Sequence, residues 1–82
     1  MRTKEEIEHF KGFCEIVGDD FPITMLDLFS TGSKIQLDSF KTCLLASLKN
    51  RKSCMIVDGT KEYKVKVTQI PIALNILDWM EQ

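Results

Sequence analysis

Apolar side chains between residues 7 and 17 recur at intervals of three and four, which is the spacing of one face of an α-helix. These positions are Ile7, Phe10, Phe13, Cys14 and Val17. Thr3 and Glu6 have the spacing of a capping box before this run, and Gly18 suits its end. We therefore predict a helix over residues 4–17, with this apolar face turned towards a core.

A second, shorter apolar run follows the acidic turn Asp19-Asp20. Pro22 suits the first turn of a helix, for which Asp20 or Phe21 would be the N-cap. The apolar residues that follow are Ile23, Met25, Leu26, Leu28 and Phe29. Because this run has almost no polar side, we predict a helix that is buried on most sides and ends at the polar segment 30–33.

The segment 34–37 allows two interpretations, a short third strand or the first turn of the next helix. Asp38 is a good N-cap for a third helix that ends near Asn50. The apolar residues of this helix are Phe40, Cys43, Leu44 and Leu48. Lys41 and Lys49 are then among its exposed positions.

Asp58-Gly59 lies between two runs of β-forming residues, which is a strong hairpin signal. A loop formed by this dipeptide would pair Cys54 with Tyr63. One face would carry Cys54, Ile56, Tyr63, Val65 and Val67, and the other Met55, Glu62, Lys64 and Lys66. Two strands alone are marginally stable, so the apolar face of the hairpin must pack on helices.

A last helix should begin at Pro71 and run to about Met80. Its apolar residues cover roughly 220° of a helical wheel, whereas packing on one core needs little more than ~100°. The apolar side chain beyond this arc, Leu74 or Trp79, must be covered by another part of the protein or by a partner. Either the helix is central and wrapped by the others, or it presents a surface to a partner or a second copy. The candidate contact residues are Leu74, Leu77, Trp79 and Met80.

These elements predict a single α+β domain over residues 1–82. Three helices come first, then the hairpin, with a third short strand near 34–37 as an option, and then the C-terminal helix. Three helices followed by a hairpin resemble the element order of winged-helix domains over residues 22–68.

Charge divides unevenly along the chain. Residues 1–40 hold four basic and eight acidic side chains, and residues 41–82 hold seven basic and four acidic ones. This bipolar pattern favours oriented docking. The basic residues around the hairpin are Lys49, Arg51, Lys52, Lys64 and Lys66. They suggest a DNA-binding wing as an alternative function, but the helix before the hairpin lacks the arginines that usually read bases.

Three cysteines and one histidine are the remaining candidates for chemistry. No pair among His9, Cys14, Cys43 and Cys54 has the spacing of a zinc site. All three thiols are predicted to point inward, which suits reduced core cysteines rather than a nucleophile beside a base. We therefore expect a non-enzymatic protein without metal or cofactor.

The N-terminal residues lack the apolar run of a signal peptide, and no stretch is long and apolar enough to span a bilayer. A cytoplasmic protein is expected. In size and overall character the whole chain resembles the small accessory and inhibitor proteins of large tailed phages, among them the cytoplasmic antiholins of T-even phages. The resemblance implies a regulator or inhibitor that binds another protein, such as the cytosolic part of a holin, and it assigns no residue a role.

Overall fold

The computed structural model describes residues 2–82 and confirms the predicted α+β fold. Its elements are the helices α1 (Lys4–Val17), α2 (Asp20–Ser30), α3 (Lys34–Lys49) and α4 (Ile70–Glu81), the strands β1 (Cys54–Asp58) and β2 (Lys61–Val65), and the 3₁₀ helix η1 (Val67–Gln69). The third strand that was an option near 34–37 is absent from the described residues, because this segment is helical.

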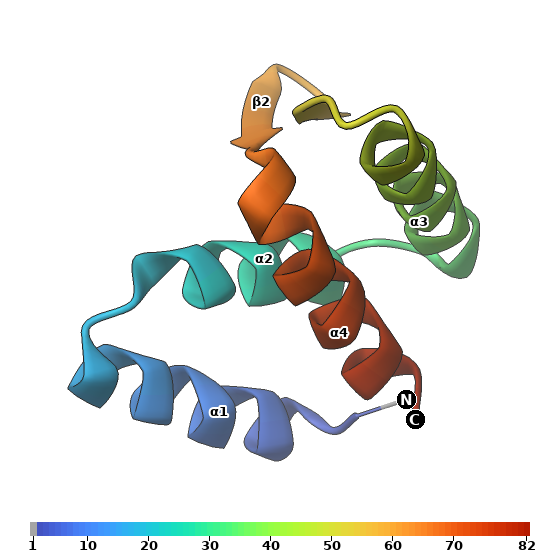
Figure 1. The fold of residues 1–82 in the computed structure, drawn as a ribbon. Helices are drawn as coiled ribbons and strands as arrows, with labels where there is room; N and C mark the ends of the chain where they lie inside the picture. The colour runs from blue at the N-terminus through green and yellow to red at the C-terminus, as the bar shows by residue number, and fades with distance from the viewer. Residues whose placement is uncertain (1) are drawn as a thin grey trace.

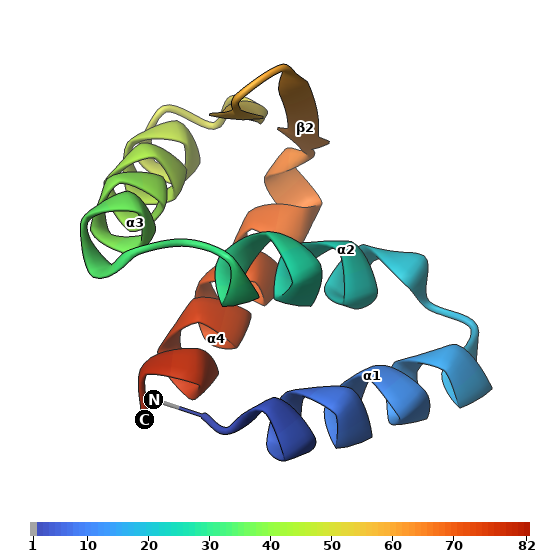
Figure 2. The same ribbon diagram turned by 180° about the vertical axis from the view of Figure 1, so that it is seen from behind.

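Helix α4 is the centre of the fold (Figure 1). It crosses α2 and also packs against α3, while α1 runs back along α2 as its antiparallel neighbour. The hairpin β1–β2 packs beside α3 and returns through η1 into α4. Seen from behind, α2 lies in front of α4 (Figure 2). Arg2 lies beside the end of α4, because its amide donates to the Met80 carbonyl.

The core is formed mainly by α2 and α4, which supply more than half of its buried apolar side chains. From α4 these are Ile70, Ala73, Ile76, Leu77 and Met80. From α2 they are Met25, Leu26, Leu28 and Phe29, together with Pro22 of its first turn. Both helices are apolar on most sides because each has neighbours on more than one side.

The predicted bounds of α1 are confirmed at both ends. The capping box forms as expected, because the Glu6 amide donates to the Thr3 hydroxyl and the Thr3 amide donates to the Glu6 carboxylate. Gly18 ends the helix in the left-handed region, with φ 82°. At the start of α2 the prediction was one residue late, because Asp19 is the N-cap and accepts from the Phe21 amide.

Helix α3 begins five residues before the start predicted from Asp38 as its N-cap. Ser33, not Asp38, is its N-cap, and Ser33 and Gln36 form a second capping box. This earlier start places Leu37 in the core, which stabilises the helix against the strand alternative.

The hairpin pairs in a register two residues away from the predicted one. Cys54 lies opposite Val65, and the loop is Gly59-Thr60 instead of Asp58-Gly59. Gly59 has φ 61° at the first loop position, where a tight hairpin of this kind needs glycine. Because the shift is even, the apolar and polar faces are those predicted. Val67 lies outside the hairpin, in η1.

Candidate functional site

The C-terminal helix does not present the predicted contact surface. Leu77 and Met80 are fully buried in the core, and Leu74 and Trp79 are half-buried against it. The central-helix interpretation therefore accounts for most of the wide apolar arc of α4. Leu74 and Trp79 are both less exposed than Ile72, a large apolar side chain of α4 that is 43% exposed.

Trp79 is covered by the N-terminal part of the chain. The Phe10 ring of α1 lies 5.0 Å from the Trp79 ring, centroid to centroid, at an interplanar angle of 57°. The Arg2 guanidinium lies 4.7 Å above the same ring. Arg2 Nε also donates to the Trp79 carbonyl at 2.9 Å, and the Arg2 amide donates to the Met80 carbonyl. These bonds cap the open carbonyls at the end of α4 and hold α1 against it.

The large apolar side chains that remain exposed lie on α1. Phe13 is 64% exposed, Ile16 86% and Val17 63%. Phe13 and Val17 were predicted to face the core, and that prediction is wrong. Of the apolar residues on α1, only Cys14 is fully buried, with Ile7 and Phe10 partly so, because α2 covers just one side of the helix.

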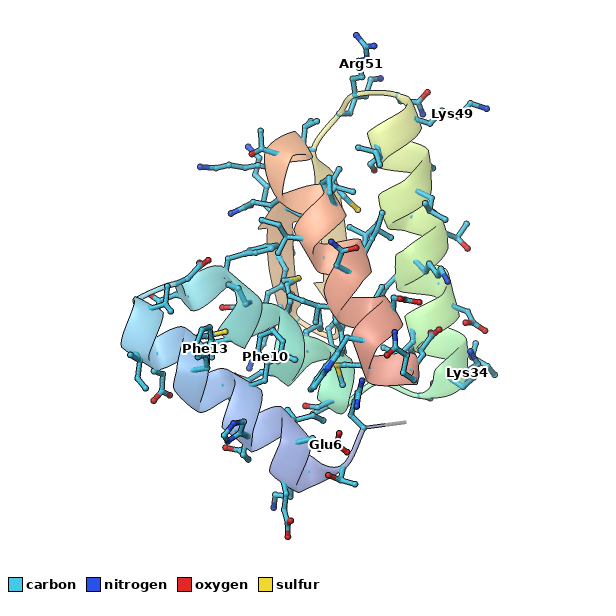
Figure 3. All side chains as sticks on the ribbon, turned by 60° about the horizontal axis from the view of Figure 1, so that its bottom comes forward. Glu6, Phe10, Phe13, Lys34, Lys49 and Arg51 are labelled. Carbon is cyan, nitrogen blue, oxygen red and sulfur yellow. The ribbon has the colours of Figure 1, made fainter. Side chains whose placement is uncertain are left out.

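These side chains border a groove between α1 and α4, with the start of α2 as its floor. We call it the aromatic groove and define it by Phe10, Phe13, Val17, Pro22, Ile72 and Trp79. Three adjoining hollows make it up, and Phe10 lines all three. The largest has a volume of about 500 Å³ and holds Phe10, Phe13 and Trp79. Figure 3 shows Phe10 and Phe13 on α1, where this helix runs along α2.

Each end of the aromatic groove carries an acidic side chain. Glu5 and Glu6 line one end together with Arg2, which forms an ion pair with Glu6, and Asp19 lines the other end. Hydrogen bonds from Thr3 and Arg2 lower the pKa of Glu6, so this carboxylate is charged at neutral pH. Glu5 is exposed and has no ion-pair partner within residues 2–82.

The basic residues lie elsewhere. Lys49, Arg51, Lys52, Lys64 and Lys66 are all exposed, and none forms an ion pair within the described part of the chain. Lys49 and Arg51 project from the end of the molecule opposite Glu6 (Figure 3). The outer face of the hairpin adds two exposed apolar side chains, Met55 and Val57. Lys49 and Arg51 are therefore far from the acidic side chain of Glu6 in the fold.

The thiols are arranged differently from the prediction. Cys14 and Cys54 are buried, but Cys43 is exposed on α3. Burial raises the pKa of Cys14 and of Cys54, which keeps both as neutral thiols and disfavours them as nucleophiles. His9 is exposed and lies in the largest hollow of the groove. Within residues 2–82 no three metal-binding side chains come together.

Comparisons with known proteins give no information on function, so a functional proposal has to be based on the geometry of the structure. The chain matches no protein-family model, no curated protein and no solved structure. Across residues 2–82, none of the helices has the length and apolar character that crossing a membrane requires.

The sequence of α1 contained a sign that some of its apolar side chains would stay exposed, but the predicted apolar face left out Ile16 and so missed it. With Ile16 included, the apolar positions of α1 span roughly 180° of its circumference, more than one packed face needs. Ile7, Phe10 and Cys14 occupy the half of this arc nearer the core, and Phe13, Ile16 and Val17 the exposed half.

Proposed function

We propose that this protein acts without catalysis, by binding another protein through the aromatic groove. The observation that carries the proposal is the exposure of Phe13 and Val17 in adjoining hollows that share Phe10 and Phe13, one of which Trp79 also lines. Exposed aromatic side chains gathered in a concave site are typical of protein-binding surfaces, because a partner can bury them together.

The shape of the groove favours a helical partner segment. Its walls are the helices α1 and α4, whose backbone groups are already paired within each helix, so no strand edge is open to an extended peptide. At 1.5 Å per residue, the 14 residues of α1 are about 21 Å long and match a partner helix of about four turns.

The charged side chains at the ends of the groove indicate which charge the partner helix should carry. Glu5 at one end and Asp19 at the other favour lysine or arginine beside the apolar stripe of the bound helix. We therefore propose a basic amphipathic helix as the partner segment. If the resemblance to T-even antiholins holds, this segment belongs to the cytosolic part of a holin, and binding in the cytoplasm delays lysis.

The test compares a groove variant with a matched surface variant. Phe13→Ser removes the most exposed ring of the groove, and Ile35→Ser removes an aliphatic side chain that is 81% exposed on α3. Burying the open part of Phe13 is worth about 1–2 kcal/mol, so its loss should weaken binding about tenfold. Both variants should stay folded.

Proteins captured from the native host by the wild type should be identified, and their affinity measured through Trp79, the only tryptophan. The proposal expects Phe13→Ser to bind the partner about tenfold more weakly than the wild type and Ile35→Ser to bind it as the wild type does. Equal binding by the wild type and Phe13→Ser would overturn the groove as the site.

The exposed cations at the other end favour a second candidate function, DNA binding. If the five cations contact phosphates, log affinity should fall with log salt at a slope of about −4 to −5. Lys64→Glu combined with Lys66→Glu should abolish binding. Undetectable or salt-insensitive binding to duplex DNA removes this candidate.

A further inference from the structure

Two cysteine thiols from different elements face each other at the edge of the core. Cys43 lies on α3 and Cys54 is the first residue of β1, and their sulfur atoms are 3.1 Å apart. The tight reversal between α3 and β1 causes this approach. Arg51 has φ 55° there, and the amides of Arg51 and Lys52 donate back to the carbonyls of Leu48 and Ser47.

The two thiols differ in their access to solvent. Cys43 is an exposed residue, whereas Cys54 is only 1% exposed. The Cys54 sulfur lies against that of Cys43, so an oxidant in solution meets Cys43 first. Burial and the neighbouring Cys43 raise the pKa of Cys54, which leaves Cys43 as the thiol that reacts first. An accessible thiol beside a protected one is the arrangement of a reactive cysteine and its resolving cysteine.

We propose that Cys43 and Cys54 are a reversible redox pair that forms an intramolecular disulfide when a peroxide is present. The Cys43 thiolate attacks one oxygen of hydrogen peroxide, the O–O bond breaks, and a sulfenic acid and hydroxide result. The Cys54 sulfur then attacks the Cys43 sulfur and displaces the sulfenic hydroxyl, which leaves with the Cys54 proton as water. In total, two thiols and one peroxide give one disulfide and two waters. A dithiol reductant returns both thiols.

The disulfide would close a short loop around three of the exposed cations. Lys49, Arg51 and Lys52 all lie between Cys43 and Cys54 in the sequence. Oxidation therefore ties the basic end of the molecule to α3 and restrains the segment that carries these charges. The aromatic groove lies on other elements, so this inference does not depend on it.

The experiment uses the purified, reduced, full chain and hydrogen peroxide at equimolar amounts. After quenching with an alkylating agent in denaturant, mass spectrometry should show a monomer that carries one alkyl group, whereas the reduced protein carries three. Without alkylation the oxidised monomer should be lighter by about 2 Da, and peptide mapping should join Cys43 to Cys54. Cys14→Ser is the matched control and should form the same disulfide. Cys43→Ser, changed at an exposed position, should form none.

A second measurement does not depend on peptide mapping. The oxidised protein should melt at least ~5 °C higher than the reduced protein, because a disulfide restricts the unfolded chain, and dithiothreitol should reverse the shift. A disulfide to Cys14, a disulfide-linked dimer or oxidation that stops at the sulfenic or sulfinic acid of Cys43 would overturn the proposal. Three free thiols after peroxide treatment would also overturn it.

Discussion

Replacement of Arg2 by alanine should destabilise the whole domain, although Arg2 lies next to the start of the chain. Its side chain joins α1 to the end of α4. Nε donates to the Trp79 carbonyl at 2.9 Å, Nη1 to Glu6 at 2.9 Å and Nη2 to Gln82 at 3.1 Å. The guanidinium also lies over the Trp79 ring. The alanine variant loses all four contacts but keeps the backbone bond from residue 2 to Met80.

The magnitude follows from the surroundings of each contact. The charge-assisted bond to the partly buried Trp79 carbonyl contributes about 1–1.5 kcal/mol, and the contact with the ring about 0.5 kcal/mol. The solvent-exposed pair with Glu6 adds little to this sum, because water screens the two charges. We therefore expect a loss of about 2 kcal/mol in the free energy of unfolding. For a domain of this size, that loss lowers the melting temperature by roughly 8–16 °C.

Urea and thermal unfolding followed by far-UV circular dichroism measure this effect without relying on Trp79, whose surroundings the substitution changes. Lys4→Ala is the matched control, because Lys4 is an exposed cation in the first turn of α1 and should change stability by less than ~0.5 kcal/mol. Arg2→Lys keeps the charge but not the planar fork, so it should recover less than half of the loss. The reasoning fails if Arg2→Ala is as stable as Lys4→Ala.

Two further substitutions test the backbone and the charges. Arg51→Gly should raise the free energy of unfolding, measured in urea, by about 0.5–1 kcal/mol, because it relieves a left-handed φ of 55°. Gly18→Ala should lower the same free energy by about 1 kcal/mol, because Gly18 has a φ of 82°. A destabilising effect of Arg51→Gly would contradict this reasoning. Hydrogen bonds lower the pKa of Glu6 from its usual 4.5, so its stabilising effect is present above that value and lost as pH falls through the folded-state pKa. The stability difference between the wild type and Glu6→Gln should therefore shrink below pH 4.5, and a difference that stays constant in acid would refute the assignment.

Local chemistry explains which elements were predicted well. The capping box at Thr3 and the glycine at residue 18 define α1 from within its own sequence. The start of α3 was misplaced because Ser33 and Asp38 are both good caps, and the capping box with Gln36 and the burial of Leu37 favour the earlier one. The hairpin register differed for a similar reason, since Gly59 suits more than one loop position.

The candidate site could not be predicted to the same extent. Its residues come from α1, α2 and α4, and the groove exists only because α1 packs against α2 on one side and leaves Phe13 and Val17 open. The apolar excess was assigned to Leu74 or Trp79, but Leu74 is half-buried against the core, and Phe10 and Arg2 cover the Trp79 ring. The approach of Cys43 to Cys54 likewise follows from the reversal at Arg51.

The sequence by itself determined the α+β class, the order of helices and hairpin, and the two faces of the hairpin, because capping, turn chemistry and side-chain period act over a few residues. Only the tertiary structure decided which apolar side chains became core and which became surface. Apolar arcs as wide as those of α1 and α4 have more than one way to be buried, and the contacts between helices select among them.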